Sequence, residues 1–221
     1  MKKTAIILGA SGLTGGLLLE KLIVDDRYES IKLFSRSSIK GLPNKVKQYI
    51  GNLLELEQFK NDFTGDEVYC CIGTTAKKTP DKSLYRDIDY GIPVAAAKLA
   101  KANGINTFLV ISAMGANKKS RVFYNRTKGE MEQEVLNQAI PRTSILRPSL
   151  IGGERNEQRL LEKIGLIVFK VIQPLFIGSL KKYRIINADS IAQAMLNLAN
   201  TTSNTDVIIT SNDIEQLAKT T

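Results

Sequence analysis

Histidine and tryptophan are both absent from this chain of 221 residues, and cysteine occurs only twice. Without histidine, nucleophilic catalysis of the Ser-His-Asp and Cys-His kinds is excluded. Zinc and haem sites lose most of their usual ligands, so we expect no metal site. Any acid–base chemistry must therefore use Tyr, Lys, Asp, Glu or Cys side chains.

The two cysteines, Cys70 and Cys71, are adjacent in an apolar run. Neighbouring residues of a strand point to opposite faces, so a disulfide between these two would be badly strained. The pattern instead predicts buried free thiols in a reducing compartment.

Long apolar runs are also lacking. The run Ala5–Leu8 follows two lysines but ends at Gly9, which is too short for the apolar core of a signal peptide. The later apolar stretch 164–178 is interrupted by polar residues and a proline, and it falls short of the roughly 20 residues that a membrane-spanning helix needs. Core packing is its commonest role, with a substrate lid, a dimer contact or a membrane-surface helix as alternatives. We predict a cytoplasmic protein.

Basic residues exceed acidic ones by 31 − 22 = +9, which favours anionic partners or a solvated basic surface. The basic clusters 77–78, 118–121 and 181–184 are scattered and lack interleaved aromatic residues. No nucleic-acid partner is therefore expected. The middle cluster has an alternative role, drawing in an anionic substrate or a phosphorylated cofactor.

Apolar runs typical of strands alternate with helical periodicity along most of the chain. This order predicts an α/β fold, a Rossmann-like doubly wound parallel sheet with helices on both faces. We expect one domain over 1–221, with about 148–221 forming a small substrate-side portion over the ligand edge of the sheet. The predicted strands are 4–8, 30–34, 46–50, 67–72, 107–111, 143–146 and one near 183–186, and the predicted helices are 13–24, 84–102, 124–138 and 188–200.

A glycine loop lies between the first predicted strand and the first predicted helix. Gly9 permits a tight turn, Gly12 lets the backbone approach a pyrophosphate, and Gly15 allows close packing of the helix on the strand. The N–H groups at the start of the helix, around Ser11, Leu13 and Thr14, favour an anion. This context of strand, loop and helix predicts a dinucleotide site.

The end of the second predicted strand bears on which dinucleotide binds. NAD enzymes usually carry an acidic residue there for the ribose hydroxyls, whereas an arginine accommodates a 2′-phosphate. This chain has Arg36 among serines and no acid nearby, and a guanidinium pairs well with phosphate. We predict NADP(H) in preference to NAD(H), with a solvated Arg36 as the alternative.

A serine, a tyrosine and a lysine follow in order at the fifth predicted strand and the next helix. Ser112 closes the strand at the edge where ligands bind in doubly wound folds. Tyr124 and Lys128 are spaced i and i+4, which places both on one helix face. A nearby ammonium lowers the pKa of a phenol, so Tyr124 becomes a usable acid or base. Ser112 is expected to hydrogen-bond a substrate carbonyl.

Several segments together resemble the atypical short-chain dehydrogenases/reductases of the HTATIP2 (TIP30)-like family. They are LGASGLTGG at 8–16, CCIGTT at 70–75, the stretch 99–135 and SILRPSLIGG at 144–153. The resemblance implies a Rossmann fold, NADPH on the glycine loop, and Ser112, Tyr124 and Lys128 as the catalytic residues.

The resemblance also extends the cofactor site. It implies that Asn52, with Leu53 beside it, meets the adenine, that Tyr124 and Lys128 also contact the cofactor, and that Arg147 and Pro148 lie near the nicotinamide. The CCIGTT segment ends a strand with a glycine, which lets the backbone pass close to a ribose; its cofactor-binding candidates are Cys71, Ile72, Gly73 and Thr74.

These features favour an NADPH-dependent oxidoreductase that reduces a small carbonyl substrate. Only about 70 residues follow Pro148, which argues against a large nucleotide-sugar substrate. The alternative is an NADPH-binding regulatory protein that senses redox state and acts through a protein partner. The substrate, the reaction direction and the choice between monomer and homodimer stay open.

Overall fold

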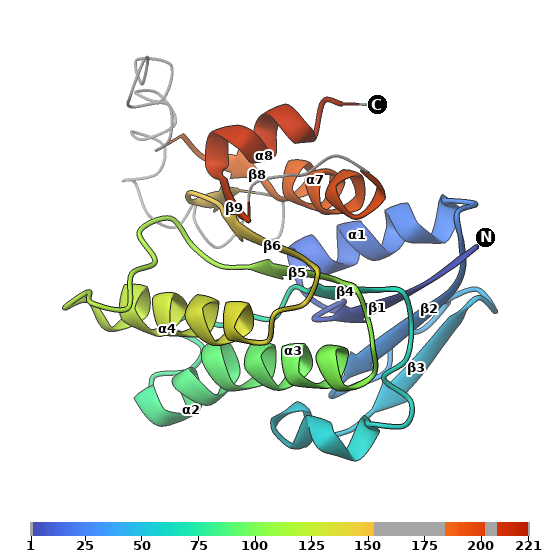
Figure 1. The fold of residues 1–221 in the computed structure, drawn as a ribbon, viewed down its shortest axis with the longest axis horizontal. Coiled ribbons are helices and arrows are strands. Elements are labelled where there is room, and N and C mark those ends of the chain that lie inside the picture. The colour runs from blue at the N-terminus through green and yellow to red at the C-terminus, as the bar shows by residue number, and fades with distance from the viewer. Residues whose placement is uncertain (1, 153–183, 202–206, 221) are drawn as a thin grey trace.

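The computed structural model describes residues 2–152, 184–201 and 207–220. Its centre is a sheet of parallel strands in the order β3-β2-β1-β4-β5-β6-β9 (Figure 1). These strands are β1 Lys3–Leu8, β2 Tyr28–Ser35, β3 Val46–Ile50, β4 Glu67–Cys70, β5 Thr107–Ile111, β6 Arg142–Arg147 and β9 Ile208–Thr210. The order reverses direction next to β1, between β1 and β4, which is the switch point where doubly wound folds bind ligands.

Helices cover both faces of the sheet, as predicted (Figure 1). One layer contains α1 Leu13–Val24, α7 Ala188–Asn200 and α8 Ser211–Leu217, and the other contains α2 Lys82–Arg86, α3 Ile92–Ala102 and α4 Phe123–Asn137. Each layer encloses its own apolar core, and every residue of β4 and β5 is buried. Near-continuous burial is what a parallel strand covered on both faces requires. The predicted fold class is confirmed.

The predicted helix 84–102 is interrupted in the structure. Between α2 and α3 lies a π-helical turn, η2 Asp87–Gly91, in which the Ile92 N–H donates to the Asp87 carbonyl five residues back. Pro93 lacks an N–H and cannot bond the carbonyl four residues earlier, which explains why the regular ladder changes at this point. Turns of this kind recur at functional sites, and this one contains Asp89.

Among the described residues, four further elements were not predicted, namely the 3₁₀ segment η1 Leu53–Phe59, β7 Ile151–Gly152, β9 and α8. β9 has three residues, too few to show a period. It pairs with β6, while α7 packs on α1, so part of the C-terminal portion belongs to the sheet and its helical layer. A separate small sheet pairs β7 Ile151–Gly152 with β8 Ile186–Asn187.

The apolar stretch 164–178 lies outside the described residues, and the strand expected near 183–186 is described only from Arg184 onward. Within the described ranges, no helix is long and apolar enough to cross a membrane.

Candidate active site

The glycine loop adopts the geometry that its sequence predicts. Gly9 has φ +89°, and a β-carbon added to it would lie 2.7 Å from the Cys71 carbonyl oxygen. A β-carbon on Gly15 would lie 2.3 Å from the Gly9 carbonyl oxygen. Both positions therefore exclude side chains. Gly12 precedes the first residue of α1, and the first turn of α1 contains no acidic residue, so its N–H end can receive an anion.

A groove of about 490 Å³ runs along the carboxyl edge of the sheet from this loop. Ten of the predicted cofactor residues line it: Gly9, Ser11, Gly12, Arg36, Asn52, Leu53, Cys71, Ile72, Gly73 and Thr74. The groove also contains residues that were not predicted: Ser35, Ser37, Leu54, Lys78, Thr79, Leu84, Ile88 and Ile92. No Asp or Glu is among the described residues that line it.

The remaining predicted cofactor residues lie outside this groove. Thr14 and Gly15 are buried within α1 and Leu13 is half-buried beside them. Pro148 is buried, and its carbonyl accepts a hydrogen bond from the Met114 N–H. The remaining three, Tyr124, Lys128 and Arg147, are engaged in contacts of their own.

Tyr124 lies on the first turn of α4 and is 39% exposed. Its ring packs edge-on against Tyr85, with ring centroids 6.5 Å apart. Burial raises the pKa of the Tyr124 phenol above its ordinary value, Lys128 lowers it, and Asp89 raises it further. Lys128 thus acts in the predicted direction, but the expectation of a lowered pKa is wrong for this arrangement, because burial outweighs the lysine.

Lys128 is 3% exposed and forms an ion pair with Asp89, with Nζ 2.7 Å from Oδ1. The other carboxylate oxygen of Asp89 accepts the Thr74 N–H at 2.8 Å. Lys128 also donates to the Ile111 carbonyl at 3.5 Å. A buried ammonium needs such a partner, and the Asp89 carboxylate holds it at the carboxyl edge, beneath Tyr124 on the same helix face.

Ser112 is buried at the end of β5, and its hydroxyl donates to Glu132 Oε1 at 2.5 Å. Arg147 in turn donates to both oxygens of Glu132, at 2.9 and 2.5 Å. The single hydroxyl proton of Ser112 is therefore engaged, and a bond to a substrate would require Glu132 to release it. The guanidinium of Arg147 is likewise committed to Glu132.

The two cysteines are free, as expected; Cys70 is buried, whereas Cys71 is only half-buried. Burial raises the pKa of the Cys70 thiol to about 11, and it also raises the pKa of Cys71, whose side chain is half-buried. Thiols react as thiolates, so the raised pKa disfavours reaction of either thiol near neutral pH.

Sequence reasoning missed Asp89 and Glu132. Glu132 continues the i, i+4 series that starts with Tyr124 and Lys128, so all three lie on one face of α4. That spacing is a signal that could have identified Glu132. Asp89 stands among apolar neighbours just before Gly91 and Pro93, and an acid in such a setting must find a partner.

The groove residues fit a nicotinamide dinucleotide. The close approach enforced at Gly9 and Gly15 brings backbone to the ligand edge, and the helix end and Arg36 supply positive charge. A dinucleotide carries its negative charge on a pyrophosphate, which matches the α1 end of the groove.

Solved structures share this fold at low sequence identity. A UDP-glucose 4-epimerase from Thermotoga maritima matches with a TM-score of 0.69 and 15% identity, over 98% of this chain and 81% of that one. The enzyme WbmH from Bordetella bronchiseptica, solved with NAD+, matches with a TM-score of 0.68 and 13% identity, over 92% and 74%. They show the architecture alone.

Curated relatives are closer in sequence. Protein FMP52-1, mitochondrial, from Scheffersomyces stipitis is 32% identical over 80% of this chain and 81% of its own length. Protein HTATIP2 from Rattus norvegicus is 33% identical over 71% and 66%. The expectation of a cytoplasmic protein is contradicted, because the FMP52 relatives are named mitochondrial.

The family model described as NAD(P)H-binding matches residues 9–161, more than half of the chain. The matched segment contains the glycine loop, the groove and the face of α4 that bears Tyr124 and Lys128. The chain therefore belongs to the NAD(P)H-binding family of Rossmann-fold proteins, in its HTATIP2-like branch of atypical short-chain dehydrogenases/reductases.

Proposed function

We propose that this NAD(P)-binding protein is an NADPH-dependent reductase of small carbonyl compounds. The observation that carries the proposal is the position of Tyr124. It lines an apolar cavity that shares Thr74 and Thr79 with the cofactor groove. A carbonyl group in that cavity would meet both the cofactor groove and a phenol.

Tyr124 is the proton donor in this proposal. NADPH held in the groove by residues such as Gly9, Gly12 and Arg36 would supply a hydride to the carbonyl carbon. The Tyr124 hydroxyl donates its proton to the carbonyl oxygen, and water then reprotonates the phenolate. Among the described residues the Tyr124 hydroxyl has no hydrogen-bond partner, which leaves its proton available for this transfer. A phenol whose pKa is raised stays protonated through neutral pH, as an acid in a reduction must be.

Lys128 and Asp89 set the electrostatics around that phenol. The Lys128 ammonium favours the phenolate that forms as the proton leaves, and Asp89 fixes the ammonium on the Tyr124 face of α4. Ser112 and Arg147 both bind Glu132 at the ends of β5 and β6 and form a support rather than a second proton donor; Ser112 and Glu132 are buried and Arg147 is half-buried.

Arg36 supports NADPH over NADH. Its side chain is exposed in the groove and has no ion-pair partner among the described residues. Ser35 and Ser37 flank it, and no carboxylate of the described lining offers the usual contact to unphosphorylated ribose hydroxyls. In fluorescence titrations, Arg36→Gln should weaken NADPH binding by about tenfold and leave NADH binding within about twofold. Equal affinity of the wild-type protein for both cofactors would reject the preference.

The proposed function is tested by following NADPH oxidation with a panel of aldehydes, ketones and quinones. Tyr124→Phe should lower kcat by about 10²- to 10⁴-fold, the usual contribution of a positioned general acid. NADPH affinity should stay within about threefold, because the phenol hydroxyl is not part of the groove lining.

The matched control is Tyr49→Phe, which removes a hydroxyl on β3, where the ring stacks on Phe34 away from the groove lining. Its kcat should equal that of the wild type. If Tyr124→Phe turns over as fast as the wild type, the assigned acid is wrong. NADPH binding without turnover of any compound would instead favour the regulatory alternative.

A further inference from the structure

A cavity of about 360 Å³ opens beside Tyr124. This volume is at the small end of ligand pockets, which span about 300–1,000 Å³, and it suits one ring with its substituents. Thr74 and Thr79 line both the cavity and the cofactor groove, and their hydroxyls hydrogen-bond each other at 2.9 Å. A molecule in the cavity therefore lies next to the groove.

Aromatic rings form one side of the cavity. Tyr85 is buried and lies edge-on to both Phe123 and Tyr124, with ring centroids 5.6 and 6.5 Å away. The Tyr85 hydroxyl donates to the Thr74 carbonyl at 3.4 Å. Burial raises the pKa of the Tyr85 phenol, so this side of the cavity stays uncharged at neutral pH. Ala76 and Pro80 add small apolar surface. Such walls favour a planar aromatic ligand, because ring pairs gain energy beyond the area that they bury.

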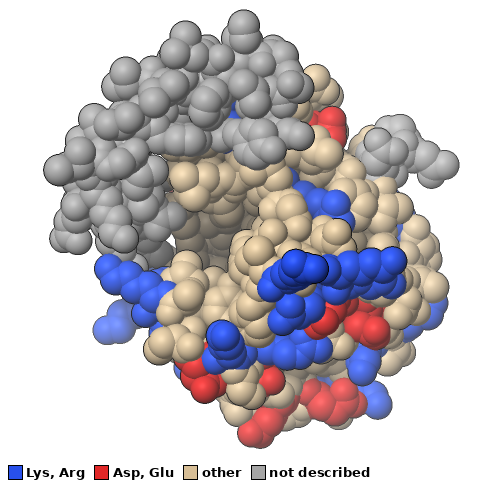
Figure 2. All heavy atoms as spheres, turned by 90° about the vertical axis from the view of Figure 1, so that its left-hand side faces the viewer, with Lys and Arg blue, Asp and Glu red and all other residues tan. Residues whose placement is uncertain are grey.

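Two cations flank this aromatic wall. Lys82 Nζ lies 5.8 Å from the centre of the Phe123 ring, and the Arg126 guanidinium lies 5.9 Å from it. Lys82 is exposed and lines the cavity, and no Asp or Glu is among the described lining residues. Figure 2 shows Lys and Arg side chains, with Asp and Glu side chains among them, on this end of the molecule next to a hollow whose described residues in view are uncharged. An anionic group at the mouth of the cavity would therefore be attracted.

We propose that the substrate is an aromatic aldehyde or ketone bearing an acidic substituent. Its ring packs against Tyr85, Phe123 and Tyr124, and its carboxylate pairs with Lys82. The inference rests on the proposed reductase function. The reaction consumes the carbonyl compound, NADPH and one proton, and it yields the alcohol and NADP+; the carbonyl carbon gains a hydride and its oxygen gains the proton of Tyr124.

The test compares probes that differ in one property at a time. 4-Formylbenzoate carries a ring and a charge, its methyl ester carries the ring without the charge, and 4-oxobutanoate carries the charge without a ring. We expect kcat/KM to be highest for 4-formylbenzoate, by about tenfold over each of the others, as one charge-assisted bond or one aromatic contact provides.

Two variants assign the effect to the cavity. Lys82→Gln should raise KM for 4-formylbenzoate about tenfold, leaving kcat and the methyl ester unaffected. The matched control Lys98→Gln removes an exposed lysine from α3, outside the cavity lining, and should change neither. Phe123→Leu should raise KM for both aromatic probes and not for 4-oxobutanoate.

The outcomes separate the substrate class from the function. If 4-oxobutanoate is reduced as well as 4-formylbenzoate, the aromatic assignment fails while the reductase stands. If the ester equals the acid, or Lys82→Gln has no effect, the anionic assignment fails. If no carbonyl compound is reduced, the proposed function fails. Benzoate binding, measured by saturation-transfer NMR and weakened by Lys82→Gln, would in that case still support a site for aromatic anions. A protein that does not bind benzoate would overturn the site as well.

Discussion

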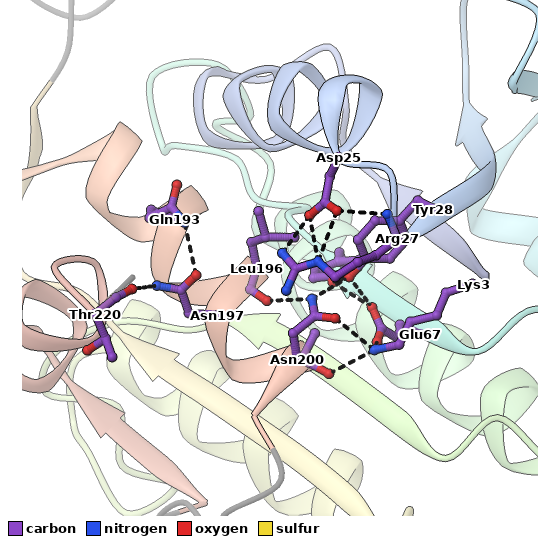
Figure 3. Close-up of polar contacts among 12 residues, drawn as sticks. Lys3, Asp25, Arg27, Tyr28, Glu67, Gln193, Leu196, Asn197, Asn200 and Thr220 are labelled. Carbon is purple, nitrogen blue, oxygen red and sulfur yellow. Dashed lines mark hydrogen bonds and ion pairs between the residues drawn. The ribbon is translucent and has the colours of Figure 1, made fainter. Parts of the chain in front are cut away.

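The two edges of the central sheet each hold a buried carboxylate, a lysine and tyrosine hydroxyls. At the amino edge, Glu67 is 2% exposed, and its partners are Lys3 and Tyr28 (Figure 3). The Tyr69 hydroxyl is a third partner. At the carboxyl edge, Asp89 is 1% exposed and pairs with Lys128 beneath Tyr124. The same residue types therefore occur in two settings of one fold.

We call the amino-edge cluster closed because each of its side chains is bonded to another group of the protein. Both tyrosine hydroxyls donate to Glu67 Oε2 at 2.7 Å, and Lys3 donates to Oε1 at 2.5 Å. Asn200 completes it from the end of α7, donating to the Tyr28 hydroxyl at 2.6 Å and accepting from Lys3 at 2.9 Å (Figure 3). Burial, with Glu67 adding to it, raises the pKa of both phenols. This cluster ties α7 to the sheet and leaves no group for a ligand.

In the carboxyl-edge cluster, the Tyr124 hydroxyl has no hydrogen-bond partner among the described residues, so we call this cluster open. The carboxylate and the ammonium satisfy each other, whereas the Tyr124 ring borders a cavity that adjoins the cofactor groove. Residue types alone therefore do not distinguish a structural cluster from a candidate catalytic site. What differs is whether the phenol has a protein partner or faces space that a substrate can enter.

The largest expected effect separates the two lysines. Lys128→Met should lower kcat by about 100-fold or more, because the charge that favours the Tyr124 phenolate is lost. Lys3→Met should leave kcat within about twofold and lower only stability. Lys128→Arg, which keeps the charge, should recover part of the rate, and circular dichroism checks folding. Equal losses of kcat in Lys128→Met and Lys3→Met would contradict the assignment of catalysis to the carboxyl edge and of structural support to the amino edge.

A second expected effect concerns stability. Glu67→Gln removes a buried charge from Lys3 and from two phenols, and it should lower the free energy of unfolding by about 3 kcal/mol. The folded fraction should keep its kcat. Urea unfolding followed by fluorescence measures the first quantity and NADPH oxidation the second. A Glu67→Gln protein of wild-type stability would show that the closed cluster is not a support.

The smallest expected effect is a pH dependence of stability. The pKa values of Tyr28 and Tyr69 are raised in the folded protein, so their contribution is fully present below the unfolded value of about 10 and is lost as pH rises through the folded values. Tyr69→Phe removes one such group and should lower the free energy of unfolding by about 1 kcal/mol at pH 8. Between pH 8 and pH ~11, the free energy of unfolding of this variant should fall less steeply than that of the wild type. A wild-type free energy of unfolding that does not change between these pH values would contradict the closed cluster.

The glycine loop and the alternation of strands with helices could be predicted because their signals are local. A strand, three spaced glycines and a helix constrain one another within a short segment, and the groove residues Gly9, Ser11 and Gly12 followed from that frame. Asp89 and Glu132 could not be assigned in the same way. Their roles depend on which strands and helices meet, since Asp89 reaches Lys128 from η2, and Glu132 reaches Ser112 and Arg147 from α4.

The raised pKa of Tyr124 was missed for a related reason. The i, i+4 spacing reveals the lysine, but it does not reveal that the phenol is partly buried or that Asp89 opposes the lysine's charge. The i, i+4 spacing predicts which residues share one face of α4. The cavity beside that face is formed with Tyr85 and the loop around Thr79, which the spacing does not reveal. Local patterns predicted the residues, and packing decides their environment.

The most direct measurement is an NMR titration with NADPH of protein labelled with ¹³C at the tyrosine ring carbon that bears the hydroxyl. Single Tyr→Phe variants assign the resonances. The resonance of Tyr124 should shift on NADPH binding, and those of Tyr28 and Tyr69 should not. A shift at Tyr28 and Tyr69 without one at Tyr124 would contradict the assignment of cofactor and proton transfer to the carboxyl edge.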